Sequence, residues 1–376
     1  MPLDPASRPK GIVVAHLPHT GAHASEHERC TLRGFVRQIA ALLGFEEGGF
    51  FDPAASYPAP LYFVPADTLT ADEAAALDIR GPGDLFGGVV PHAFVATKVI
   101  SHPLVHPQAA ATPGWNPELA RRLGDAVLAG FSAFTLDDAR EAGRRLLARG
   151  PVRIKPVRAT GGRGQGVAHD AAALDRLLDA VDQPQVHESG LVLEEDLADP
   201  VTFSVGQVQV GDLLASYFGV QKLTPDNQGQ TVFGGSDLTV ARGGYDELAP
   251  LAPDADVVRA IAQARHYEET VRACYPGFYA SRSNCDVALG RDADGRPRSA
   301  VLESSWRAGG ATGPELAALE AFRADPRRRC VRASCVEAFG DAPPPPEHAT
   351  VYFRGHDPQV GLLTKYTVVE EHDHSR

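Results

Sequence analysis

Short apolar runs alternate along the chain with longer stretches in which apolar residues recur every three or four positions. The short runs predict buried strands, and the longer stretches predict amphipathic helices. Residues 11–15, GIVVA, are the first predicted strand, and a helix over about residues 28–44 follows and ends at Gly44. A strand, a loop and a helix in this order predict an α/β lobe with its ligand-binding edge at the carboxyl end of the strand.

The same patterns predict a second series of elements from residue 135 onward. Thr135, followed three positions later by Asp138, is typical of a helix start, and this helix runs to Gly150. Residues 201–220 alternate in polarity and turn at Gly211–Asp212, which predicts an antiparallel hairpin. Further predicted elements are strands at 151–157 and 191–197, a helix from Asp170, a helix over 254–273 and a helix from about Pro314.

Four units follow from this order of elements. An N-terminal α/β domain covers residues 1–125, a central lobe covers 126–197, and a C-terminal lobe covers 198–340. The proline-rich run at 341–348 ends the last lobe, so residues 341–376 are predicted to form a short appendage. The fold class is therefore α/β, with α+β lobes.

Composition narrows the functional classes. The chain has 376 residues, of which 43% are hydrophobic and 22% charged, with a net charge of −12. This acidic balance argues against a nucleic-acid partner. We expect no membrane association, because no apolar run reaches the roughly 18 residues that cross a bilayer. The N-terminal residues lack the apolar core of a secretory signal, and the five cysteines lack CxxC spacing, so we expect a cytoplasmic protein with reduced thiols.

A rare lysine precedes a glycine-rich loop in the stretch 151–167, PVRIKPVRATGGRGQGV. Lys155 ends an apolar strand, and the loop contains Gly161, Gly162, Gly164 and Gly166. Such glycines let successive backbone N–H groups point at an anion, and the lysine adds a positive charge. The loop is neither a Walker A sequence nor a dinucleotide fingerprint. A phosphate site and a glycine-rich turn beside a solvated lysine both remain open.

Two carboxylates form a second candidate site. Asp286 and Glu303 lie on apolar strands joined by RDADGRPR, and Asp294–Gly295 predicts a hairpin turn. A turn centred there sets these two residues directly opposite each other. Opposed carboxylates repel unless a cation lies between them, and Mg²⁺ prefers such oxygen ligands together with nucleotide phosphates. If the register slips, one carboxylate faces solvent instead.

A third candidate is the acidic end of the strand 191–197. Glu194, Glu195 and Asp196 precede Leu197. The run either marks the point where a strand reaches the surface, or forms a hinge whose backbone binds adenine and whose carboxylate binds ribose. The residues alone leave both readings open.

Taken in order, these motifs resemble the ATP-grasp superfamily over residues 126–325, with a pre-ATP-grasp domain before them; the whole chain also looks similar to an uncharacterised bacterial family of this kind. The resemblance assigns Lys155 and loop 161–166 to the phosphates of ATP. It assigns Glu194, Glu195 and Leu197 to adenine and ribose, and Asp286 and Glu303 to Mg²⁺. Ser305 stands where the family usually has a metal-binding asparagine. Arg307 matches the arginine beside the reacting phosphoryl group, and GGATG at 309–313 resembles the segment that closes the acceptor site.

The resemblance also implies a further phosphate-binding lysine before the central lobe. Lys98 is the candidate, with Arg121 or Arg122 as alternatives. Lys222 falls where residues on the substrate side usually lie. His16, His19, His23 and His27 are interpreted as loop polarity or substrate contacts in preference to a metal site.

The implied activity is that of an ATP-dependent ligase. Such an enzyme activates a small-molecule carboxylate as an acylphosphate, which an amine or similar nucleophile then attacks; relatives of this kind often form homodimers. Ser305 favours an alternative, a non-catalytic or regulatory ATP-binding protein. A third alternative, a dinucleotide-dependent oxidoreductase, is disfavoured because the predicted helix starts several residues after the last glycine of the loop.

Overall fold

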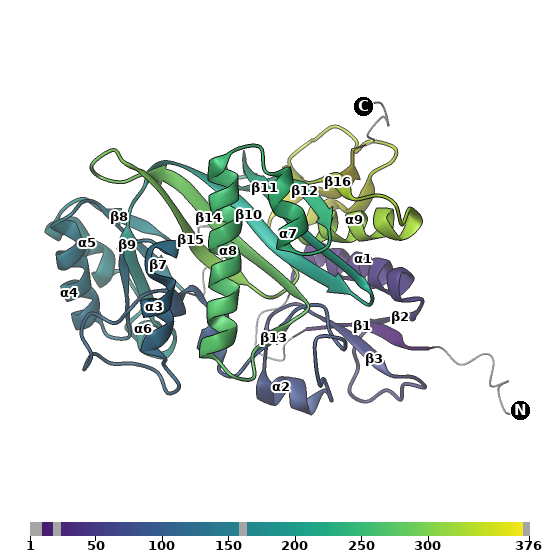
Figure 1. The fold of residues 1–376 in the computed structure, drawn as a ribbon, viewed down its shortest axis with the longest axis horizontal. Coiled ribbons are helices and arrows are strands. Elements are labelled where there is room, and N and C mark those ends of the chain that lie inside the picture. The colour runs from purple at the N-terminus through teal and green to yellow at the C-terminus, as the bar shows by residue number, and fades with distance from the viewer. Residues whose placement is uncertain (1–9, 18–23, 158–163, 371–376) are drawn as a thin grey trace, which may run out of the picture.

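The computed structural model describes residues 10–17, 24–157 and 164–370. Its strands form a central eight-stranded sheet, a four-stranded sheet at one end of the molecule, and two three-stranded sheets (Figure 1). Helices cover these sheets, which confirms the predicted mixture of α and β structure.

The N-terminal lobe is a small parallel sheet with one covering helix. Helix α1 connects β1 to β2 and begins two residues earlier than predicted, where the Ser25 hydroxyl accepts the N–H of Glu28. Gly44 ends the helix as predicted, in a left-handed conformation with φ of 66°. The elements are β1 (Ile12–His16), α1 (Glu26–Leu43), β2 (Glu46–Phe50), β3 (Leu61–Pro65), β4 (Leu69–Thr70), α2 (Ala71–Ala76) and β5 (Gly88–Val90).

A connecting segment leads from this lobe to the central one. This segment forms β5 and then two short 3-10 helices, η2 (Ala93–Ala96) and η3 (Lys98–Ser101). All four residues of η3 are buried, which places the Lys98 side chain inside the protein. Helix α3 (Pro117–Leu123) and η4 (Gly124–Ala126) complete the segment.

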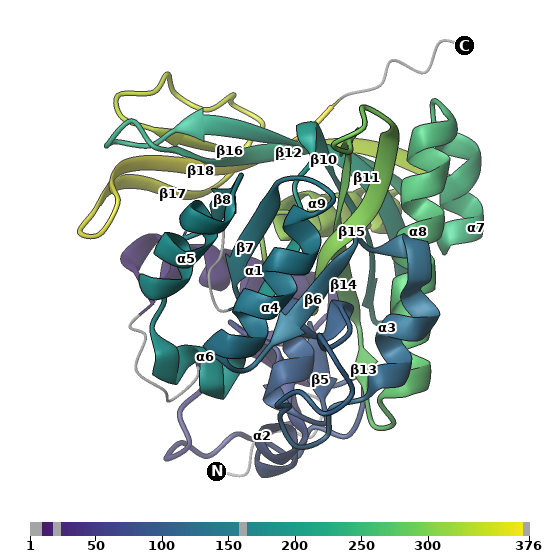
Figure 2. The same ribbon diagram turned by 90° about the vertical axis from the view of Figure 1, so that its left-hand side faces the viewer.

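The central lobe is an antiparallel sheet in the order β6-β9-β7-β8, packed against α4 and α5 (Figure 2). Thr135 caps α4 by accepting the N–H of Asp138, as predicted. Its elements are β6 (Gly130–Ala133), α4 (Leu136–Leu147), β7 (Val152–Pro156), β8 (Gly166–Ala168), α5 (Ala171–Asp179), α6 (Gln183–Ser189) and β9 (Leu191–Glu195).

The large sheet has the strand order β15-β14-β10-β11-β12-β16-β18-β17. Its hairpin of β10 and β11 turns at residues 211–212, as predicted. The elements that first appear here are β10 (Ala198–Val210), β11 (Leu213–Pro225), β12 (Thr231–Arg242), α7 (Tyr245–Leu248), η5 (Ala249–Leu251), α8 (Ala255–Cys274), β13 (Tyr279–Ala280), β14 (Arg282–Arg291), β15 (Pro297–Ser305), α9 (Thr312–Ala324), β16 (Cys330–Phe339), β17 (Thr350–Asp357) and β18 (Gly361–Val369).

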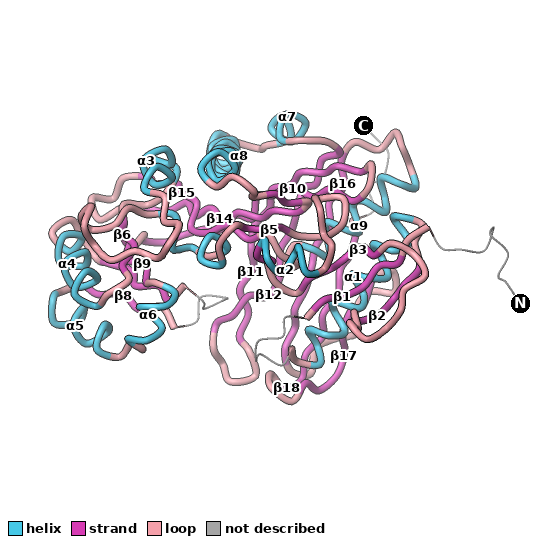
Figure 3. The backbone as a smooth tube through the Cα atoms, turned by 90° about the horizontal axis from the view of Figure 1, so that it is seen from below, coloured by secondary structure: helices cyan, strands magenta, loops and turns pink. Residues whose placement is uncertain are grey.

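Helices cover both faces of this sheet (Figure 3). Val205 packs in one core with Ala260 and Ala264 of α8, whereas Val208 packs in another core with Leu316 of α9 and residues of α1. Because neighbouring side chains on a strand point to opposite faces, odd-numbered positions of β10 face α8 and even-numbered ones face away from it.

The last segment is not an appendage. Strand β18 pairs with β16 over seven residue pairs, and β17 closes the edge of the large sheet while packing against α1. The prediction was wrong because the proline run at 341–348 was interpreted as the end of the fold. It is a loop between β16 and β17, two neighbours of the same sheet.

Within the described ranges, no helix is both long enough and apolar enough to span a bilayer.

Candidate active site

A cavity of about 590 Å³, the interlobe cavity, lies between the central lobe and the large sheet. Its walls are formed on the sheet side by the face of β10, β14 and β15 that is turned away from α8. A volume of this size is typical of small-molecule sites. The cavity brings together, from the residues singled out in the sequence, Lys98, Lys155, Glu194, Glu195, Leu197, Asp286, Glu303, Ser305 and Arg307.

Lys155 and Glu194 form a buried ion pair on the central-lobe wall. The Lys155 Nζ atom contacts Glu194 Oε1, and His102 Nε2 lies 3.1 Å from Glu194 Oε2. Burial alone would raise the pKa of Glu194, but the charge of Lys155 and the hydrogen bond with His102 hold this pKa at about 2. Lys155 is therefore not a solvated lysine, and Glu194 does not mark a strand reaching the surface. Nothing in the sequence around His102 indicated its part in this cluster.

The ion pair predicts a specific loss of stability in acid. The folded-state pKa of Glu194 is lower than its ordinary value of 4.5, so its ionised form stabilises the fold above about pH 4.5. This contribution, at most about 3 kcal/mol, is lost as the pH falls toward 2. We expect urea unfolding at pH 7, 4 and 3 to show a steeper loss of stability in the wild type than in Glu194→Gln. Equal losses in the two proteins would contradict this assignment.

The other two acids of the hinge each pair with an arginine. Glu195 Oε1 accepts hydrogen bonds from Arg298 Nη2 at 2.9 Å and from the Ala129 N–H at 3.2 Å. Arg153 Nη2 lies 2.6 Å from Asp196 Oδ1. Arg298 belongs to β15, so the Glu195 pair links the central lobe to the large sheet. Glu195 is already engaged in this link, which differs from the ribose contact that the resemblance implied.

Asp286 and Glu303 lie opposite each other on β14 and β15, as predicted. Asp286 Oδ1 accepts hydrogen bonds from Gln221 Nε2 at 2.8 Å and Asn284 Nδ2 at 2.9 Å. Burial and the neighbouring charge of Glu303 raise the pKa of Asp286 to about 6. Lys98 Nζ lies 2.6 Å from Glu303 Oε2, so a cation of the chain itself relieves part of the repulsion.

A bulge in the hairpin produces this pairing. Pro297 lies opposite Arg291, which centres the turn on Asp294 and not between Asp294 and Gly295. If this register continued unbroken, Leu302 would face Asp286. The register shifts by one residue between Asp286 and Val287, and Glu303 takes that place. Bulges commonly re-aim side chains beside active sites.

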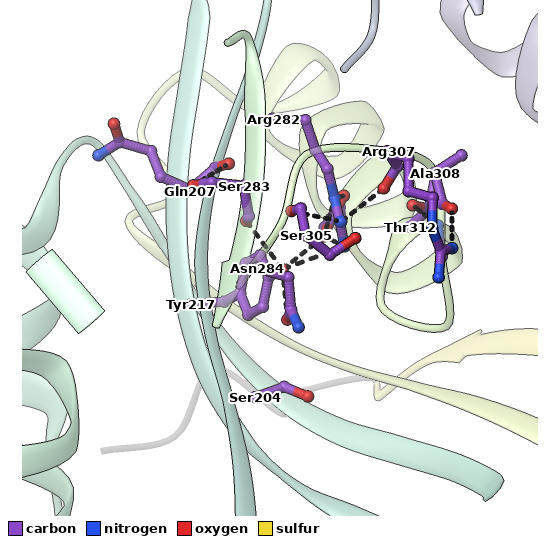
Figure 4. A network of polar contacts seen from close by, with 12 residues as sticks. Ser204, Gln207, Tyr217, Arg282, Ser283, Asn284, Ser305, Arg307, Ala308 and Thr312 are labelled. Carbon is purple, nitrogen blue, oxygen red and sulfur yellow. Dashed lines mark hydrogen bonds and ion pairs between the residues drawn. The ribbon is translucent and has the colours of Figure 1, made fainter. Parts of the chain in front are cut away.

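Ser305 faces Asn284 across the same two strands (Figure 4). Asn284 Oδ1 lies 3.0 Å from the Tyr217 hydroxyl oxygen, and Asn284 Nδ2 donates a hydrogen bond to Asp286. An amide side chain is therefore present at this level of the hairpin, although on β14 and not at position 305. Its bonds orient Asp286.

A buried ion pair between Arg282 and Glu315 lies next to the end of β15. Arg282 Nη2 donates to Glu315 Oε1 at 2.7 Å, and the two side chains are 2% and 0% exposed. Arg282 Nη1 donates to the carbonyl oxygen of Arg307 at 2.6 Å (Figure 4). The Tyr217 hydroxyl donates to Glu315 Oε1 at 2.6 Å. Arg282 thus fixes the backbone that carries Arg307 into the cavity.

The glycine loop lies only partly within the described residues. Gly161 and Gly162 fall outside them. Gly164 has φ of 69°, a conformation that favours glycine, and Gly166 opens β8 opposite Ile154. Gln165, between these two glycines, lines the interlobe cavity. The C-terminal end of the glycine loop therefore borders the same cavity as Lys155.

Two predicted placements differ from the structure. Lys222 does not line the cavity; its exposed side chain pairs with Asp237 at 2.6 Å, whereas its neighbours Gln221 and Leu223 line the cavity. Alternation along β11 points Lys222 to the other face of the sheet. Arg121 and Arg122 both pair with Glu118 on the exposed side of α3, so they do not replace Lys98.

The donor set fits a nucleotide and a hard divalent cation. Across residues 10–17, 24–157 and 164–370, no three or more His, Cys, Asp or Glu side chains form a group that would hold a metal. His19 and His23 lie outside these ranges. Asp286 and Glu303 supply only two carboxylates, which suits Mg²⁺ because this ion commonly takes one or two carboxylates together with substrate phosphates. Lys98, Lys155 and Arg307 supply positive charge around the same space.

Comparison with known proteins gives one family match and a set of structures with a similar fold. The sequence profile of the DUF3182 family, described as a protein of unknown function, matches residues 14–367. No curated protein sequence matches the chain. Among solved structures, biotin carboxylase from Campylobacter jejuni, in complex with β,γ-ATP, is 11% identical with a TM-score of 0.55 and covers 98% of this chain and 89% of its own. N5-carboxyaminoimidazole synthetase from Staphylococcus aureus, complexed with ADP, is 12% identical with a TM-score of 0.54. The match covers 96% of this chain and 93% of the synthetase chain.

A third similar structure is phosphoribosylamine–glycine ligase from Thermotoga maritima, which is 17% identical with a TM-score of 0.51 and covers 95% of this chain and 92% of its own. At these identities the likeness concerns the fold. The fold is that of the ATP-grasp ligases, as the sequence resemblance implied.

Proposed function

The chain belongs to the DUF3182 family of proteins of unknown function, and we propose that it is an ATP-dependent ligase that joins a carboxylate to an amine or similar nucleophile through an acylphosphate. One observation carries this proposal. The cationic side chains of Lys98, Lys155 and Arg307 are among those that line a single cavity of about 590 Å³, and they come from elements far apart in the sequence. Two opposed carboxylates, Asp286 and Glu303, line the same cavity.

The residues of the cavity divide the binding of MgATP among them. Lys155 and Lys98 neutralise phosphate oxygens, and the backbone of the hinge at 194–197 binds the adenine edge, with Leu197 against the base. Asp286 and Glu303 hold Mg²⁺, which neutralises the negative charge of the phosphates when bound. Lys98 Nζ lies 2.6 Å from Glu303 Oε2, so its charge would add to that of the metal beside the phosphates.

The chemistry proceeds in two transfers. A substrate carboxylate oxygen attacks the γ-phosphorus, the bond from this phosphorus to the β-phosphate oxygen breaks, and ADP leaves. A neutral amine nitrogen then attacks the carbonyl carbon of the acylphosphate, and the bond from this carbon to the phosphate oxygen breaks. The released phosphate takes the proton that the nitrogen loses. Arg307 stabilises the phosphoryl group in both transfers, because its positive charge lines the same cavity as the two carboxylates.

The test is ADP release from MgATP in the presence of a pooled library of amino acids, other carboxylates and amines. We expect release that depends on the library and is lost in Glu303→Ala. Glu269→Ala, which removes an exposed carboxylate from α8, is the matched control and is expected to keep the signal. Tight MgATP binding without any library-dependent turnover would instead support a non-catalytic nucleotide-binding protein.

Location and assembly belong to the same proposal. All five cysteines are free, in keeping with a cytoplasmic protein. A homodimer, which the resemblance implies, is tested by the mass of the chain in solution.

A further inference from the structure

A second cavity, of about 560 Å³, adjoins the interlobe cavity. Arg307, Gly309 and Gly310 line both cavities, so the two meet where the phosphoryl group is proposed to be transferred. The walls of the second cavity come from α1, from N-terminal loop residues that include Asp67, from the segment after Arg307, and from the strands β16 and β18 with Tyr352 of β17. Of these, β17 and β18 belong to the segment that the sequence predicted to be an appendage.

The outer wall is fixed firmly to the body of the protein. The ring of Tyr352 lies between two glycines: a Cβ atom at Gly34 of α1 would lie 2.5 Å from it, and one at Gly313 of α9 would lie 3.1 Å from it. The Tyr352 hydroxyl donates to Gln38 Oε1 at 2.8 Å, and its ring packs against that of Phe35 at 5.1 Å. Glycine at both Gly34 and Gly313 lets the Tyr352 ring pack closely against α1 and α9. This close packing indicates that the wall is a fixed part of the cavity and not a hinged flap.

The charged groups of the second cavity are mostly acidic. Glu28, Asp67 and Glu337 line it, against Arg307 and Lys365. Lys365 pairs with Glu337 at 2.9 Å, and both side chains are less than one-fifth exposed. Burial lowers the pKa of His27, and the charge of Lys365 lowers it further, so His27 adds no positive charge at neutral pH.

The charge balance then indicates the ligand. Asp67 Oδ1 lies 3.9 Å from Arg307 Nε, and in the proposed function Arg307 serves the phosphoryl group. Glu28 and Glu337 then remain against Lys365, an excess of one carboxylate. Apolar surface from Leu32, Phe35 and Tyr352 lines the remainder of the space. The excess carboxylate stabilises a positive charge, and the apolar surface accommodates a hydrocarbon body.

We infer that the second cavity is the acceptor compartment and takes a primary amine with an apolar or aromatic body, which binds as its cation and gives one proton to a carboxylate of the cavity before its neutral nitrogen attacks the acylphosphate. This inference rests on the proposed function, which supplies the acylphosphate at the boundary between the two cavities. The Lys365–Glu337 pair sets the selectivity of the compartment: Glu337 attracts the ammonium group and Lys365 limits that attraction.

Three probes of matched shape test the charge selectivity: 2-phenylethylamine, 2-phenylethanol and 3-phenylpropionate. Their binding to the full chain in the presence of MgADP is measured by ligand-observed NMR titration. We expect the amine to bind roughly tenfold more tightly than the carboxylate, with the alcohol between them. Equal binding of the three, or tighter binding of the carboxylate, overturns the inference.

Two variants of one ion pair separate selectivity from damage to the fold. Glu337→Gln is expected to weaken amine binding several-fold, and Lys365→Met to strengthen it. Misfolding would weaken binding in both, so effects of opposite sign support the inference and effects of the same sign contradict it. Arg354→Met, which removes an exposed cation from the same hairpin but not from the cavity, is expected to change neither affinity.

MgADP binding, measured on the same samples, distinguishes the two proposals. A wild-type chain that binds MgADP but shows no preference for the amine overturns the inference and leaves the proposed function standing. A wild-type chain that does not bind MgADP overturns the proposed function, and the inference falls with it.

Discussion

Arg282→Met is expected to lower the free energy of unfolding by about 3–5 kcal/mol, the loss typical of breaking a buried ion pair at one side. The substitution leaves the carboxylate of Glu315, which is 0% exposed, without its cationic partner. It also removes the donor to the carbonyl oxygen of Arg307, so ATP turnover should fall as well. Urea unfolding followed by circular dichroism measures the loss of stability.

A second substitution identifies the cause. In Arg282→Met/Glu315→Leu no unpaired charge remains buried, so we expect part of the lost stability to return. Arg265→Met removes an exposed arginine from α8 and is expected to leave stability unchanged, since its partners Asp246 and Glu269 lie at the surface. If the double variant is no more stable than Arg282→Met, the loss comes from the hydrogen bonds to the backbone and not from the unpaired Glu315.

The opposed carboxylates show how far the sequence alone leads. The turn signal at Asp294–Gly295 correctly predicted that Asp286 and Glu303 face each other. The reason was incomplete, because the turn is centred half a residue earlier and a bulge at Leu302 restores the pairing. Turn residues follow from local backbone preference, whereas a bulge depends on what both strands pack against, and this packing is not written in either strand.

Contacts between residues far apart in the sequence could not be predicted from sequence patterns. Glu194 was visible as an acid at the end of an apolar strand, but His102, 92 positions earlier, has no feature that ties it to Glu194. Lys222 drew attention by its rarity, yet alternation along β11 places Gln221 at the cavity instead. The register of the β10–β11 hairpin follows from its turn at Gly211. Extending this register along β11 would have indicated that Gln221, and not Lys222, faces the cavity.

The prediction of an appendage at residues 341–376 was wrong for a related reason. A run of prolines at 341–348 reads as a boundary because proline cannot donate to a sheet ladder. In the structure the run only bridges two strands of the same sheet, and the residues after it pair with β16. Strand alternation after residue 350 was a usable signal, but whether such strands join an existing sheet depends on a free edge elsewhere in the chain. That edge also completes the second cavity, so the missed pairing hid a candidate site.

Asp286→Asn is expected to reduce ATP turnover by at least about 10²-fold while making the metal-free chain more stable by about 1–2 kcal/mol. The amide keeps an oxygen that accepts from Asn284 and Gln221. It also removes one of two opposed negative charges, whose repulsion, with burial, raises the pKa of Asp286 to about 6. A site that holds two like charges together stabilises a bound cation at the expense of the empty fold. Thermal unfolding in EDTA and steady-state ADP release measure the two effects.

The two effects must separate for this account to hold. ADP alone should stabilise the wild type and Asp286→Asn equally, since Lys155 and the hinge are untouched, whereas adding Mg²⁺ should raise the stability of the wild type further and that of the variant little. Ser305→Asn offers the converse comparison: an amide at this position, opposite Asn284 on β14, should strengthen the response to Mg²⁺. A loss of stability of Asp286→Asn in EDTA would contradict this account. It would show that the hydrogen bonds of the Asp286 carboxylate to Gln221 and Asn284 stabilise the fold by more than its repulsion from Glu303 destabilises it. The carboxylate pair would then serve mainly to stabilise the hairpin.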